Sequence, residues 1–94
     1  RHQQRVVLLH LVDVLARLGV TYRQGDYWAT SGYVTVLDKD GVRMPGGGKG
    51  PGGNLERYID AEETDHLEHM TTLVKAGMRP EAATRTARMW AAVK

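Results

Sequence analysis

The sequence predicts one mainly α domain with a small β wing, made of about four helices and a two- to three-stranded antiparallel hairpin. In three segments of the chain, apolar residues recur at steps of three and four, as on one face of a helix. Between these segments, β-forming residues flank the turn sequence Asp-Lys-Asp-Gly. Because 94 residues suffice for one domain with a modest core, we treat residues 1–94 as a single unit.

The first helix is expected within a helix-turn-helix that covers about residues 9–31. Gly19 supplies its stop signal. The apolar run 6–9 fits either an extra helical turn or a short strand, because its periodicity is compatible with both. The apolar positions that predict this helix are Leu8, Leu11, Val12, Leu15 and Leu18.

A second helix is expected only three residues later. Thr21 can cap its first turn, and Gln24 can bond back to the cap. This helix should run from Tyr22 to about Ala29 and end before Gly32. A short turn containing glycine is typical of a helix-turn-helix, although such a turn also joins ordinary helical hairpins.

The wing is expected over about residues 33–58. Residues 33–37 and 42–44 should form its two strands, and residues 55–58 can return as a third. The segment 46–53 holds six of the chain's 11 glycines, which predicts a flexible, exposed loop.

Two C-terminal helices are expected, over about residues 61–76 and 80–93. Asp60 and Glu63 form a second capping box, and Pro80 suits a first helical position. The resulting order of elements is that of a winged helix. An exposed Trp90 would indicate a partner surface, whereas a buried one would indicate a self-contained monomer. The expected apolar faces comprise Leu67, Met70, Leu73 and Val74, then Ala83, Ala87, Trp90 and Ala91, with Met44, Met70, Met78 and Met89 as core filler.

Composition excludes several classes of protein. The net charge is +2, and residues 60–69 form an acidic belt between two basic zones that could face a polyanion. With no cysteine, the chain has no disulfide framework, no cysteine-based zinc site and no thiol nucleophile. No apolar run is long enough for a membrane span, and no signal-peptide pattern is present. We therefore expect a cytoplasmic protein.

Three other patterns give little support for catalysis or cofactor binding. His66 and His69 lie at i and i+3 among acidic residues, where a metal site could be drawn, but a solvated helix face is the preferred interpretation. Residues 48–53 match G-x-G-x-x-G, yet no strand-to-helix junction surrounds them. Ser31 has no histidine and acid at usable spacing. We expect no enzyme activity, no cofactor and no metal.

The segment from Gly19 to Val34 resembles the helix-turn-helix of MerR-type winged-helix DNA-binding domains, of the kind found in actinobacteria and actinophages. The resemblance departs from the family at Gly25, where a leucine or isoleucine is usual, and in a longer wing. The 94-residue sequence also stops at Lys94 without the long helix through which effector-sensing members dimerise. Either that helix lies beyond residues 1–94, or this is a minimal member without an effector domain; no small-molecule effector is evident. The resemblance implies that the second helix enters the major groove of double-stranded DNA.

The expected DNA contacts come from the second helix and the wing. Arginine can bind guanine or phosphate, glutamine can read adenine, and a tyrosine hydroxyl can bind phosphate. Of the two adjacent aromatic residues in the second helix, Trp28 is expected in the core. The candidate DNA-binding residues are Thr21, Tyr22, Arg23, Gln24, Tyr27, Arg43, Lys49, Arg57 and Tyr58.

These observations predict a small transcriptional regulator that binds specific sequences in double-stranded DNA. Two alternatives stay open: an excisionase, or recombination directionality factor, of a phage or mobile element, and a protein-interaction adaptor on a winged-helix scaffold. On DNA, either a homodimer or a cooperative head-to-tail array would fit. Such a DNA-binding protein would associate with the nucleoid, and no membrane partner is expected.

Overall fold

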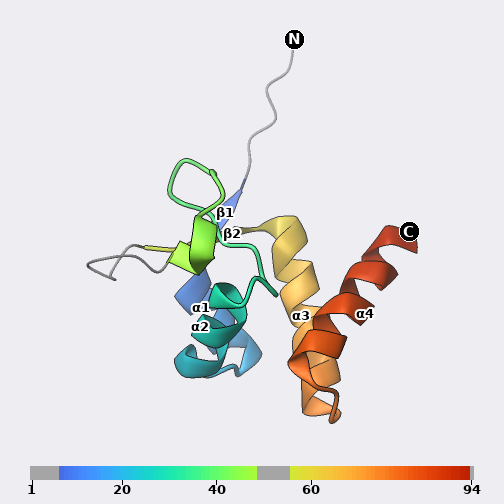
Figure 1. Cartoon of the computed structure of the whole chain (residues 1–94). Coiled ribbons are helices and arrows are strands. Elements are labelled where there is room, and N and C mark those ends of the chain that lie inside the picture. Colours follow the sequence, from blue (N-terminus) through green and yellow to red (C-terminus); the bar gives the residue numbers. More distant parts are fainter. Residues whose placement is uncertain (1–6, 49–55, 94) are drawn as a thin grey trace.

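The computed structural model describes residues 7–48 and 56–93, which fold into a mainly helical domain with a two-stranded antiparallel sheet (Figure 1). In Figure 1, α1 and α2 lie on one side, while α3 and α4 run antiparallel on the other. This arrangement is compatible with a winged helix. In chain order the elements are β1 (Leu8–His10), α1 (Leu11–Leu18), α2 (Tyr22–Thr30), the 3-10 turn η1 (Pro45–Gly48), β2 (Tyr58–Asp60), α3 (Ala61–Lys75) and α4 (Pro80–Val93).

Two residues of the apolar run before α1, Leu8 and Leu9, lie in the strand β1. Leu9 pairs with Ile59 in the antiparallel sheet that β1 forms with β2. The first amide of α1, that of Leu11, donates to the Arg57 carbonyl at 2.9 Å. The start of α1 is thus tied to the chain that enters β2.

The turn between α1 and α2 has the chemistry that the sequence predicts. Gly19 ends α1 in the left-handed conformation, at φ 74°, where glycine carries no steric penalty. The Thr21 side chain caps α2 by accepting from the Gln24 amide at 3.1 Å. α2 extends to Thr30, one residue past the expected end.

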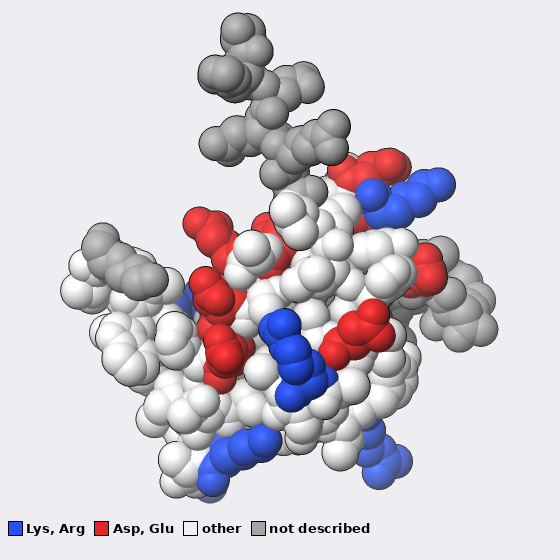
Figure 2. All heavy atoms as spheres, turned by 180° about the vertical axis from the view of Figure 1, so that it is seen from behind, with Lys and Arg blue, Asp and Glu red and all other residues white. Residues whose placement is uncertain are grey.

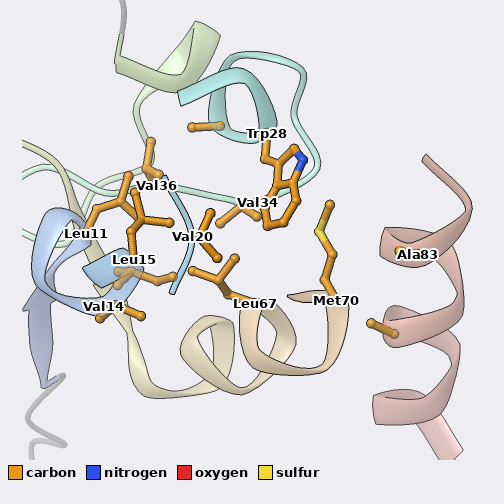
Figure 3. Packing of buried hydrophobic residues seen from close by; sticks show 13 residues of the cluster. Leu11, Val14, Leu15, Val20, Trp28, Val34, Val36, Leu67, Met70 and Ala83 are labelled. Carbon is orange, nitrogen blue, oxygen red and sulfur yellow. The ribbon is translucent and has the colours of Figure 1, made fainter. Parts of the chain in front are cut away.

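The core lies where the two helical pairs meet (Figure 3). Trp28 is only 1% exposed, which confirms its expected place. Figure 3 shows Met70 of α3 rising between Trp28 and the part of α4 that carries Ala83. Ala83 and Ala87 are fully buried, and their small side chains let α4 approach α3 closely.

The close packing of α2 on α1 requires a glycine at position 25. A Cβ at this position would lie 2.4 Å from the Leu15 Cδ1 atom. Leu15 therefore occupies the space that a larger side chain at position 25 would need.

The wing is smaller than expected. Its reversal is held by Asp38 N–H donating to the Val42 carbonyl at 2.8 Å, and by Met44 N–H donating to Val36 at 3.0 Å. Leu37 makes isolated bridges to Arg43 and to Tyr58. The expected strands over 33–37 and 42–44 are therefore single bridges, and the expected 55–58 strand begins only at Tyr58, where β2 pairs with β1.

The expectation of an exposed loop over 46–53 is wrong for its first part. Residues 45–48 form η1, which packs on α2. Gly47 is buried so closely that a Cβ there would lie 2.4 Å from the Ala29 carbonyl oxygen. Residues 49–53 lie outside the described residues.

The C-terminal helices begin and end close to their expected positions. Asp60 caps α3 by accepting from the Glu63 amide at 2.8 Å. On α4, Met89 and Trp90 are 69% and 60% exposed, so the expectation that Met89 fills the core is wrong. None of the helices in residues 7–48 and 56–93 combines the length and apolarity needed to cross a bilayer.

Candidate nucleic-acid interface

One face of α2 is open to solvent while the opposite face is fixed in the core. Tyr22 and Tyr27 are 60% and 53% exposed, and Arg23 is also exposed. Trp28 anchors the buried face of the same helix. The N-cap at Thr21 fixes the first turn, which carries Tyr22, Arg23 and Gln24. An aromatic and cationic surface is thus presented on a rigid helix.

Arg57 lies beneath this surface and its side chain is only 9% exposed. Its guanidinium donates to Asp26 at 2.8 Å, to the Gly47 carbonyl at 3.2 Å and to the Tyr22 hydroxyl at 3.0 Å. It also lies 5.6 Å from the centroid of the Tyr22 ring. The expected role of Arg57 as a free cation for DNA does not match this environment, because three of its five N–H donors bond groups within the protein and the side chain is largely buried. Arg57 joins α2, η1 and the start of β2.

The tyrosines of the candidate set have different surroundings. The Tyr58 hydroxyl donates to Glu56 at 2.9 Å, and this hydrogen bond, with a smaller effect of burial, raises the pKa of Tyr58. Its ring lies against His10, so Tyr58 belongs to the sheet. The Tyr27 ring meets Tyr33 edge-on, with 6.0 Å between centroids. Burial raises the pKa of Tyr33, and the neighbouring Tyr27 hydroxyl raises it further.

The expected wing cations are only partly placed. Arg43 is exposed at the end of the reversal that follows α2. Lys49 lies outside the described residues. Seen from behind the view of Figure 1, the surface has acidic and basic side chains interspersed, not one continuous basic area (Figure 2). This face therefore offers no continuous basic surface.

A buried polar network holds the segment after α2 against α3 and α4. Glu63 accepts from the Thr35 amide at 2.7 Å and pairs with the Arg88 guanidinium. Burial pushes the pKa of Glu63 upward, but the hydrogen bonds from Arg88 and Thr35 outweigh it, and the net pKa is lowered. The Glu63 side chain thus serves tertiary packing in addition to its place in the first turn of α3.

His66 belongs to the same network, so its expected place on a solvated face is wrong. It is 3% exposed, and its Nε2 lies 3.1 Å from the Tyr33 carbonyl and 3.0 Å from the Thr84 hydroxyl. Because a carbonyl only accepts, Nε2 must carry the proton. Burial lowers the pKa of His66, and the Arg88 charge lowers it further. Periodicity gave no signal for this network, since its partners lie 18 to 33 residues apart.

Within residues 7–48 and 56–93, no three His, Asp or Glu side chains are arranged to hold a metal ion. Comparison with protein-family models, with curated proteins and with solved structures found no match to this chain. The exposed face of α2 and its supports are therefore the basis for a functional inference.

Proposed function

We propose that this protein is a small transcriptional regulator that binds specific sequences in double-stranded DNA through α2. The observation that carries the proposal is the exposed group Tyr22, Arg23 and Tyr27 on a helix whose other face is locked by Trp28. A rigid helix that displays one cation between hydroxyl-bearing aromatic residues suits the major groove, which admits an α-helix. The resemblance to MerR-type domains supports the same orientation.

The proposed contacts divide between bases and backbone. Arg23 can bond both guanine acceptors, and Gln24, half-buried beside it, can reach adenine. The Tyr22 and Tyr27 hydroxyls suit phosphate oxygens. Arg43 and Lys49 would lie along the adjacent backbone or minor groove. Thr21 contributes by holding the first turn of α2 through its cap.

Arg57 and Tyr58 have changed roles in this proposal. Arg57 bonds the Tyr22 hydroxyl and neutralises Asp26, so α2 does not present an uncompensated carboxylate to phosphate. We assign Arg57 as a positioning residue for α2. Tyr58 is assigned to the sheet, through its contacts with Glu56 and His10.

Selection from random duplex DNA, followed by binding measurements at a series of salt concentrations, tests the proposal. We expect an enriched motif and a log–log salt slope of about −2, if Arg43 and Lys49 each neutralise one phosphate and release its counterion while Arg23 contacts a base. Inverted repeats in the motif would indicate a homodimer, and direct repeats a head-to-tail array. Absence of both enrichment and salt dependence would contradict DNA binding.

A further inference from the structure

A groove of about 550 Å³ separates the first half of α3 from the last half of α4. Two acidic residues, Glu62 and Asp65, and the aromatic residue Trp90 are among those that line it. Figure 2 shows acidic side chains gathered beside the C-terminal part of α4, and Figure 1 shows this end of α4 diverging from α3 on the side away from α1 and α2. The groove is thus separate from the exposed face of α2.

Trp90 makes this groove different from an ordinary charged helix face. Its side chain is 60% exposed, and its ring centroid lies 5.1 Å from that of His69. The neighbouring Met89 and Val93 are also exposed. A large aromatic residue that is exposed yet held by a second ring is already ordered for contact, so binding would cost it little conformational entropy.

The electrostatics of the groove favour a cation. Glu62 and Asp65 are both exposed, and the one arginine of the lining, Arg88, is paired with Glu63. At the groove, His66 is buried and its Nδ1 has no hydrogen-bond partner in the described part of the chain. With the proton on Nε2, the Nδ1 lone pair adds further negative potential. Phosphate would be repelled here.

We propose that this groove binds a cationic segment of another protein, in which lysine or arginine alternates with apolar residues. The cation would lie between the two carboxylates and the face of the Trp90 indole, which attracts positive charge. The apolar neighbours would cover Ala91 and Ala92 in the lining. This surface is independent of the DNA interface, so the failure of one proposal leaves the other in place.

The probe is the peptide Ac-Arg-Leu-Arg-Leu-Arg-NH₂, compared with Ac-Glu-Leu-Glu-Leu-Glu-NH₂ and titrated into the ¹⁵N-labelled protein of residues 1–94 at constant ionic strength. We expect only the basic peptide to bind, with shifts at the Trp90 indole N–H and at the amides of residues 62, 65 and 69. The Trp28 indole N–H should not move, since it is buried in the core.

Matched variants separate the groove from general attraction between opposite charges. Glu62→Gln/Asp65→Asn should weaken binding about fivefold, as expected for two exposed ion pairs, and Trp90→Ala about tenfold, as for an aromatic anchor. The control Asp13→Asn/Glu56→Gln removes two other exposed carboxylates and should bind as the parent protein does. Equal weakening by both double variants, or absence of binding, would overturn the proposal. So would sedimentation that shows a dimer dispersed by Trp90→Ala, since a second copy would then occupy the groove.

Discussion

The Arg57 guanidinium lies 2.8 Å from the Asp26 carboxylate, joining residues that are 31 positions apart in the chain. Both side chains are largely buried, and Arg57 also reaches the η1 carbonyl of Gly47 and the Tyr22 hydroxyl. A single side chain therefore holds α2, η1 and the approach to β2 together. The orientation of the candidate recognition helix depends on a residue that the sequence suggested for direct DNA contact.

Arg57→Ala should lower the free energy of unfolding by about 3 kcal/mol, because it removes a largely buried ion pair with Asp26 together with the hydrogen bonds to Gly47 and Tyr22. Urea denaturation measures this loss. The control Arg43→Ala removes an exposed arginine and should change stability by at most about 0.5 kcal/mol. Equal stability of the two variants would contradict the positioning role of Arg57.

Gly25→Ala should destabilise the protein even though alanine is the better helix former by about 1 kcal/mol. The new Cβ would meet the Leu15 side chain at 2.4 Å, and the close α1–α2 packing leaves little room for it. Thermal unfolding of Gly25→Ala and of Leu15→Ala/Gly25→Ala provides the test. In a Leu15→Ala background, Gly25→Ala should cost less stability than it does in the parent protein. A Gly25→Ala variant that is more stable than the parent protein would refute the packing explanation.

Stability should fall as the pH is lowered from 7. Folding lowers the pKa of His66. Below the ordinary histidine pKa of 6.5, the unfolded chain therefore binds a proton at this side chain while folded His66 stays neutral, which favours the unfolded state. Glu63 also has a lowered pKa, and its contribution should be lost below about pH 4.5, as the folded carboxylate is protonated. Both effects have the same sign.

Urea unfolding at a series of pH values measures these two contributions. His66→Asn should flatten the dependence between pH 6.5 and the lower pKa of the folded histidine, and Glu63→Gln should flatten the part below pH 4.5. His10→Asn, which changes an exposed histidine, serves as the control. An unchanged pH profile in His66→Asn would show that this histidine is not the group responsible.

Local signals predicted most of the helices and their ends. Thr21, Asp60 and Gly19 act within three or four residues of the turns they control, so their capping roles can be identified from the sequence. The pairing of β1 with β2 could not be predicted from the sequence, because each strand has only three residues and the two lie 50 residues apart. Strands this short carry no periodic pattern of their own.

The buried polar contacts beneath and beside the candidate site could not be predicted from the sequence either. Arg57 and His66 are polar residues whose neighbours in the chain suggest exposure, and only tertiary contacts place both in buried networks. The opposite error concerns Met89, which was expected in the core and is exposed. Hydrophobicity alone does not show which side of α4 faces α3. Trp28 was placed correctly because it and Tyr27 must point to different sides of one helix.

The central claim concerns Arg23, and the most direct measurement compares two arginine variants on the selected duplex. Arg23→Ala should weaken binding by about 1–3 kcal/mol and relax preference at one base position. Arg79→Ala removes the same charge from an exposed position just before α4 and should leave both affinity and preference nearly unchanged. Both proteins should unfold at the same urea concentration as the parent. If Arg23→Ala binds the duplex as tightly as Arg79→Ala does, α2 is not the recognition helix.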